Sequence, residues 1–323
     1  MPPFPRPSFP YDYSLADEVA ALRRYRDTRK ERQVPKRRRD RLLLATWNIA
    51  NLGLHERHVQ DYALIAELIR WFELVAIQEV NDDLRGLRAV LAHLPKHYRA
   101  LFSDAGGNRE RLAFVYDTRK LSLLEKIGEV AIPPSEARHV RLPNTAQTFT
   151  GFDRNPYLAA FRAGSLTFLL VAVHLYFGGG KNAATSKRDM NRRSLETYAV
   201  ARWADLRRRS RHAYTREIFT LGDFNLPKAE PGDPVYDALT ARGLQLPEHS
   251  NKIGSSLRKD VAYDQIAFFP TPTGEPVLTA SSVFDWDGAV FADLWRTRGA
   301  IDFFSFARHA ISDHRILWAQ LRI

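Results

Sequence analysis

The chain has 323 residues and contains 48 Lys or Arg, 37 Asp or Glu and no cysteine. The lack of cysteine excludes a disulfide framework, a cysteine zinc site, an iron–sulfur cluster and a thiol nucleophile. Hydrophobic residues make up 45% of the chain and charged residues 26%, a composition typical of a folded globular protein with a sizeable core. The formal net charge of +11 favours polyanionic partners, such as nucleic acid or an anionic membrane surface.

Residues 1–41 predict a basic N-terminal extension, because they hold 12 Lys or Arg against 6 Asp or Glu. Prolines in the first ten residues disfavour a helix there, whereas Ser14, followed by Asp17 and Glu18, is typical of a capped helix start. The basic run at 36–39 fits either a solvated linker or an arm that contacts phosphates. No secretory leader pattern and no run of roughly 18 apolar residues is found, so we expect a cytoplasmic protein without a membrane partner.

From residue 42 onward, short apolar runs alternate with amphipathic stretches, which predicts a single α/β domain over residues 42–323. The expected helices cover 58–72, where apolar residues recur at helical spacing, and 188–209, which has one apolar face. Several strands are too long or too closely spaced to be parallel strands separated by helices, so we expect a mixed sheet. The expected strands lie at 42–49, 74–80, 112–117, 157–162, 166–177, 217–224, 261–269 and 311–323.

Polar side chains of the metal-binding and acid/base kinds recur at the ends of these apolar runs. An unpaired buried carboxylate is costly, so several of them beside hydrophobic strands indicate a shared site. Taken singly, each has an ordinary explanation, such as a turn for Asp223 or a satisfied core histidine for His174. Their oxygen ligands suit Mg²⁺, Mn²⁺ or Ca²⁺. The full set is Asn48, Glu79, His174, Asp223, Asn225, Asp313 and His314.

Six short motifs follow one another along the main domain: TWNIANLG (46–53), IQEV (77–80), HLYF (174–177), GDFN (222–225), YDQI (263–266) and SDH (312–314). Each motif is weak alone, but GDFN with a terminal SDH and an upstream QE is a specific combination. Together they resemble the endonuclease/exonuclease/phosphatase superfamily, and DNase I-type nucleases within it. The resemblance implies an α/β (α+β) fold, the DNase I-like four-layer α/β/β/α sandwich with mixed sheets.

The resemblance also implies a metal site. Glu79 and Asp313, assisted by Asn48, would hold a divalent cation that clamps a phosphate oxygen. Asp223 and Asn225, the polar residues of GDFN, would orient the attacking water and the phosphate or complete a second metal site. The sequence leaves open whether one metal or two take part.

The resemblance further implies two histidines oriented by carboxylates. His314 would be supported by Asp264, and His174 by Glu110, so that the two imidazoles serve as general base and general acid. Arg154, in the segment FDRNPY, would stabilise the charge that develops at the scissile phosphate. These residues would together supply the proton transfers that phosphodiester hydrolysis needs.

Two positions depart from the DNase I pattern. Asn81 stands where DNase I has an arginine that enters the minor groove, and Asn108 where it has a groove-contacting tyrosine. Preference among DNA sequences therefore does not follow from the resemblance. The segment 186–216 holds 10 Lys or Arg against 3 Asp or Glu. Four of its basic residues could follow a phosphate backbone, namely Lys187, Arg188, Arg192 and Arg193. A solvated basic helix face explains the same charges equally well.

The leading interpretation is a divalent-metal-dependent nuclease that acts on DNA, with RNA left open and no obligate protein partner. Another phosphoesterase of the same fold, acting on a phosphoinositide, a sphingomyelin-type lipid or an abasic site, is the nearest alternative. A catalytically silent nucleic-acid-binding protein is the alternative from a different class. The complete set of polar site residues favours an enzyme over this silent protein.

Overall fold

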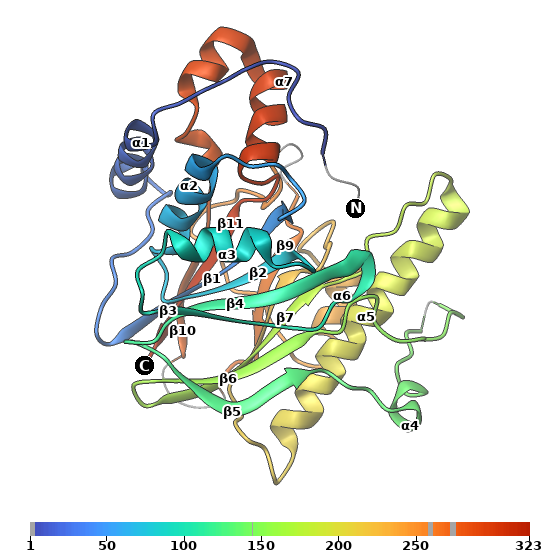
Figure 1. The fold of residues 1–323 in the computed structure, drawn as a ribbon. Helices are drawn as coiled ribbons and strands as arrows, with labels where there is room; N and C mark the ends of the chain where they lie inside the picture. Colours follow the sequence, from blue (N-terminus) through green and yellow to red (C-terminus); the bar gives the residue numbers. More distant parts are fainter. Residues whose placement is uncertain (1–3, 144, 258–260, 272–275) are drawn as a thin grey trace.

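The computed structural model describes residues 4–143, 145–257, 261–271 and 276–323, and two β-sheets form its centre (Figure 1). The strand order of the first sheet is β10 (Leu278–Phe284), β11 (Ile316–Arg322), β1 (Arg41–Leu52), β2 (Leu74–Asn81), β4 (Glu110–Asp117) and β3 (Tyr98–Phe102). The second has the order β5 (Ser122–Glu129), β6 (Tyr157–Ala163), β7 (Leu166–His174), β8 (Ile218–Asp223) and β9 (Asp264–Phe268). In the first sheet β1 is parallel to β2, and in the second β7 is parallel to β8; the other described pairs are antiparallel. Both sheets are therefore mixed, as the sequence predicts.

The two sheets pack face to face over a shared apolar core. Leu42 and Leu44 of β1 point into this core, where they join Phe161 of β6 and Phe168 of β7. Side chains alternate between the two faces of a strand, so Trp47 of β1 lies on the opposite face, in a separate cluster with the helices. β1 is buried almost throughout because both of its faces are covered.

Helices cover the outer face of each sheet, which completes the expected four-layer α/β/β/α sandwich (Figure 1). The first sheet is covered by α1 (Leu15–Thr28), α2 (Val59–Ile69), α3 (Arg85–Ala92) and α7 (Ala292–Ala310), and the second by α5 (Ala183–Arg209) and α6 (Pro234–Thr240). The shorter elements are α4 (Pro134–Ala137), η1 (Gly107–Arg109) and η2 (Trp286–Gly288). Within the four described ranges, no helix combines the length and the apolar character that crossing a bilayer requires.

Several predicted elements differ in their bounds. The strand expected over 166–177 ends at His174, and the helix expected over 58–72 covers Val59–Ile69. The long helix begins at Ala183 rather than at 188, because Asn182 caps it by accepting a hydrogen bond from the backbone N–H of Thr185 at 2.9 Å. The strand expected over 261–269 forms only over β9. The last strand begins at Ile316 instead of 311, so the SDH motif lies in the turn that precedes it.

The N-terminal extension packs against the main domain. Ser14 caps α1 as predicted, accepting a hydrogen bond from the backbone N–H of Asp17 at 3.3 Å, and Leu22 of this helix is fully buried. Arg37, within the basic run, pairs with Asp117 at 3.0 Å and donates to the carbonyl of Arg70 at 2.7 Å. Arg37 therefore anchors the chain where β1 begins. This end of the first sheet lies away from Asn48 and Glu79.

Candidate active site

Strand ends from both sheets bring the predicted residues to one place. Asn48 and Glu79 lie near the carboxyl ends of the parallel strands β1 and β2. His174 and Asp223 end the parallel strands β7 and β8 and are partners in register. Since β1 and β8 contact each other between the sheets, these four residues meet at one edge of the sandwich. Ligands commonly bind beyond the carboxyl ends of strands in folds of this kind.

Asn48 links the two sheets. Its Nδ2 donates to Glu79 Oε1 at 3.0 Å within the first sheet and to Asp223 Oδ2 at 3.1 Å in the second. All three side chains are buried. Burial alone would raise the pKa of Asp223, but the nearby His314 and His174, with hydrogen bonds to the carboxylate, hold it below its ordinary value. Asp223 is therefore a carboxylate onto which groups from both sheets converge.

His174 is oriented by Glu110, as the resemblance implies. Its Nδ1 lies 3.0 Å from Glu110 Oε2, and its Nε2 lies 3.7 Å from Asp223 Oδ2. Burial favours the neutral acid, yet the hydrogen bond with His174 and the charge of Arg154 lower the pKa of Glu110 to about 2. Arg154 Nε also donates to the carbonyl of His174 at 2.9 Å. Arg154 thus positions the pair, and its contact with a scissile phosphate stays a prediction.

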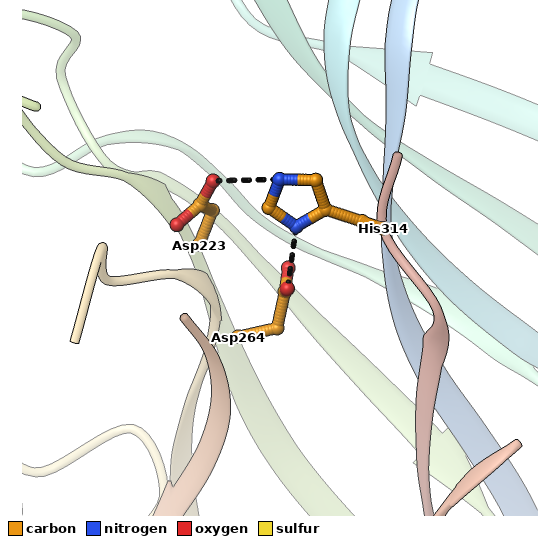
Figure 2. A group of neighbouring side chains, drawn as sticks. All are labelled: Asp223, Asp264 and His314. Carbon is orange, nitrogen blue, oxygen red and sulfur yellow. Dashed lines mark hydrogen bonds and ion pairs between the residues drawn. The ribbon is translucent and has the colours of Figure 1, made fainter. Parts of the chain in front are cut away.

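His314 forms the second supported imidazole (Figure 2). Its Nδ1 lies 2.7 Å from Asp264 Oδ2, and its Nε2 faces Asp223 Oδ2 at 3.9 Å. Burial disfavours a charged ring, but Asp264, Asp223 and Asp313 outweigh this effect and raise the pKa of His314 well above its ordinary value. Ligand atoms of Asp223, Asp264 and His314 all lie within 4.8 Å of one another, so this group could itself hold a metal ion.

The residues predicted to hold a cation supply suitable oxygen atoms. Burial and the charges of Glu79 and Asp223 raise the pKa of Asp313, although His314 opposes the shift. Asn48 Oδ1 is buried and has no hydrogen-bond partner within the described part of the chain. Excess negative charge beside an unsatisfied amide oxygen is what a hard divalent cation would neutralise. Glu79, Asp313 and Asn48 therefore have the chemistry that a hard divalent cation requires, and their role as its ligands stays a prediction.

The backbone is unusual at three residues around this site. Asn51, Glu79 and Asn225 have φ values of +48°, +60° and +51°, in the left-handed region. The register of β1 with β2 shifts around Asn51, and that of β2 with β4 shifts around Glu79, which indicates bulges that redirect side chains. Glu79 Oε2 accepts a hydrogen bond from the Asn51 backbone N–H at 2.8 Å. Such conformations are costly and cluster at functional sites, where surrounding structure stabilises them.

Residues not identified from the sequence hold His314 in place. Trp47 Nε1 and Trp286 Nε1 both donate to the His314 carbonyl, at 2.9 and 3.0 Å. Ser312 Oγ accepts from the His314 backbone N–H at 3.0 Å and donates to the Asn48 carbonyl at 2.6 Å. Ser312 belongs to the SDH motif, and this motif indicates that it lies at the site. The tryptophans sit in apolar runs and carry no such signal.

The predicted basic residues of α5 differ in their surroundings. Arg188 is exposed. Arg192 pairs with Asp153 at 3.3 Å and Glu196 at 3.2 Å, and its guanidinium lies 3.9 Å from the Tyr176 ring centroid. A phosphate at Arg192 would have to share the guanidinium with two carboxylates. Arg193 is buried and donates to backbone carbonyls, so its guanidinium does not face solvent. The predicted contacts of the other three basic residues with a phosphate backbone stay predictions.

The architecture defines the class of fold. Two mixed sheets pack face to face, helices cover both outer faces, and a polar site lies at the ends of the strands. The chain has the DNase I-like fold of the endonuclease/exonuclease/phosphatase superfamily, as the motifs predict. No protein-family model matches the sequence, and no curated protein is similar to it by sequence comparison.

Solved structures of low sequence identity share this fold. An endonuclease/exonuclease/phosphatase from Bacteroides vulgatus has a TM-score of 0.55 at 15% identity, covering 88% of this chain and 99% of that chain. A mannosyl-6-phosphatase from Bacteroides thetaiotaomicron has a TM-score of 0.53 at 16% identity, covering 87% and 100%. D. rerio TDP2 complexed with single strand DNA product has a TM-score of 0.52 at 16% identity, covering 88% and 99%. At these identities the likeness concerns the fold.

Proposed function

We propose that the protein is a divalent-metal-dependent hydrolase of phosphodiester bonds and that DNA is its favoured substrate. The observation that carries this proposal is the approach of two carboxylate-supported imidazoles, His174 and His314, to Asp223 Oδ2 at 3.7 and 3.9 Å. An oriented imidazole can accept or donate a proton during a reaction. Two of them on one small site supply both of the proton transfers that hydrolysis of a phosphodiester requires.

In the proposed reaction, a water oxygen attacks phosphorus and the bond to the leaving oxygen breaks. One imidazole accepts the proton of the water, and the other gives a proton to the leaving oxygen. Glu110 and Asp264 hold the two rings with Nε2 directed into the site. A bound divalent cation, held by Glu79, Asp313 and Asn48, would act as a Lewis acid that neutralises charge on the phosphoryl oxygens.

The choice of DNA rests on charge and on one similar structure. The chain carries a formal net charge of +11, and the exposed Lys187 and Arg188 lie in the second turn of α5, the long helix that follows the His174 loop. Such charges attract a polyphosphate backbone. One structure of the same fold, TDP2 from D. rerio, is complexed with single strand DNA product. The positive charge favours a nucleic acid over a small phosphate ester.

A substrate panel tests the proposal. Supercoiled plasmid, linear duplex, single-stranded DNA, RNA, phosphoinositide and small phosphoesters are incubated under one buffer with Mg²⁺, Mn²⁺ or EDTA. We expect cleavage of DNA that EDTA abolishes. Turnover confined to a small ester or a lipid would favour the other phosphoesterases of this fold. DNA binding without cleavage of any substrate would favour the catalytically silent protein.

A further inference from the structure

Phe177 is an aromatic residue beside the candidate active site, and the proposed reaction gives it no role. It lies three residues after His174, in the loop that leaves β7, and is 47% exposed. Single exposed hydrophobic residues are common on protein surfaces, so exposure alone indicates little. Phe177 differs from such residues because neighbouring side chains hold its ring in place.

Arg193 fixes the loop that carries Phe177. This buried arginine of α5 donates to the carbonyl of Tyr176 at 2.9 Å and also to the carbonyl of Phe177. Its guanidinium lies 5.2 Å from the Phe177 ring centroid, within the range of a cation–π contact. A third hydrogen bond, to the Asn225 carbonyl at 3.0 Å, ties Arg193 to the GDFN segment. Phe177 is therefore an exposed ring on a supported loop.

Tyr263 connects Phe177 to the proposed catalytic centre. The Phe177 and Tyr263 rings meet edge to face, with centroids 6.4 Å apart and an interplanar angle of 83°. The Tyr263 ring is in turn 6.1 Å from the ring of His314, at an interplanar angle of 36°. Phe177, Tyr263 and His314 thus form a row of rings that leads from the exposed loop into the site.

We propose that Phe177, backed by Tyr263, stacks on the nucleobase of a nucleotide next to the scissile phosphate. This inference rests on the proposed function and narrows its substrate class. The faces of a base inside an intact duplex are covered by neighbouring bases, and inserting a ring there costs the unstacking of a base step. An exposed ring therefore stacks most readily on an unpaired or terminal base. The preferred substrate is accordingly single-stranded DNA or a frayed duplex end. Stacking of this kind tolerates every base, because each has a π-face.

Matched oligonucleotides test the stacking directly. One substrate is single-stranded oligothymidylate, and the other has the same length and phosphate spacing but carries abasic sugars throughout. We expect Phe177→Ala to lower kcat/KM on oligothymidylate by roughly 5- to 150-fold, the change that corresponds to the loss of one stacked base, and to leave the abasic strand within about twofold. Phe177→Trp keeps a π-face and should retain the wild-type preference for bases.

Controls separate stacking from folding and from the proposed function itself. Tyr214, which is 40% exposed and precedes the opposite end of β8, provides the variant Tyr214→Ala, and it should behave as wild type on both substrates. Equal losses on both substrates in Phe177→Ala, or no loss, would overturn the stacking role while nuclease activity stands. A wild-type protein that cleaves neither strand nor any nucleic acid of the panel would overturn both proposals.

Discussion

His174 and His314 come from different sheets and direct their Nε2 atoms at the same carboxylate oxygen, Asp223 Oδ2, from 3.7 and 3.9 Å. His174 ends β7 in the second sheet, and His314 precedes β11 in the first. Their partners differ as well, because Glu110 belongs to the first sheet and Asp264 to the second. Each supported imidazole is therefore assembled across the sandwich, and its geometry depends on how the two sheets pack.

The first prediction concerns these histidines. His174→Ala and His314→Ala should each lower turnover of single-stranded DNA by about 10²- to 10⁴-fold, because each removes one general acid or base. The matched control is His93→Ala, an exposed histidine at the end of α3, which should keep wild-type turnover. Circular dichroism and thermal melting check that the variants fold. Wild-type rates in the two site variants would show that the imidazoles do not take part.

The second prediction concerns the cation. Glu79→Gln and Asp313→Asn should each weaken Mn²⁺ binding, measured by isothermal titration, by about 10-fold or more, since each replaces a charged ligand with a neutral amide. A bound cation stabilises the folded state by mass action, so Mn²⁺ should also raise the Tm of the wild-type protein more than that of either variant. An unchanged Mn²⁺ affinity in both variants would indicate that the cation binds elsewhere, for instance at the Asp223, Asp264 and His314 group.

The sequence predicted the buried centre of the fold better than its margins. The central strands β1, β2, β7 and β8 stand out as apolar runs, because both of their faces are covered. Three strands were not predicted, namely β3, β5 and β10, and each lies at the edge of a sheet. Edge strands such as β5 are only partly buried and mix polar with apolar residues. Their conformation comes from pairing with a neighbour, which a local pattern does not reveal.

The same distinction holds for the site. Side chains within recognisable motifs, such as Glu79 and Asp264, were named from the sequence. Asn51 was not named, because it contributes a hydrogen bond from its backbone N–H. Every residue except proline carries this donor, so the type of residue does not reveal it. The aromatic row was missed since Phe177 and Tyr263 are 86 positions apart in the chain and meet only after the sheets pack.

The third prediction concerns acid stability. The rings of His55 and His309 stack with centroids 4.7 Å apart and an interplanar angle of 15°, and both are buried. Burial, reinforced by the charge of Arg57, lowers the pKa of His55 to about 3 and that of His309 to about 4. Below pH 6.5 the unfolded chain binds protons that the folded chain excludes. Each histidine therefore removes up to about 1.4 kcal/mol of stability per pH unit as the pH falls toward its folded pKa.

His309→Gln isolates one of these contributions. The free energy of unfolding, measured with urea at pH 7 and pH 5, should fall less in this variant than in the wild-type protein, by roughly 2 kcal/mol. Burial raises the pKa of Glu196 to about 7, so this group acts in the opposite direction, but it does so equally in both proteins. His93→Gln, at an exposed position, should retain the wild-type dependence on pH. An identical pH dependence in His309→Gln and wild type would contradict the neutral, buried state of His309.

The fourth prediction concerns Gly222, the glycine of GDFN. Its φ is +137°, and a Cβ at this position would lie 2.1 Å from the Val173 carbonyl oxygen of the neighbouring strand. Gly222→Ala would force alanine into a strained backbone conformation and press its Cβ against this carbonyl oxygen. The substitution should therefore destabilise the protein by roughly 3 kcal/mol or more. Gly179→Ala is the matched control, because a Cβ there meets no atom within 4 Å and should leave the urea midpoint nearly unchanged. Because His174 and Asp223 are paired across these same strands, a folded Gly222→Ala protein should also lose turnover. Equal stability of the two alanine variants would show that β7 and β8 separate without cost, contrary to the close approach that aligns the site.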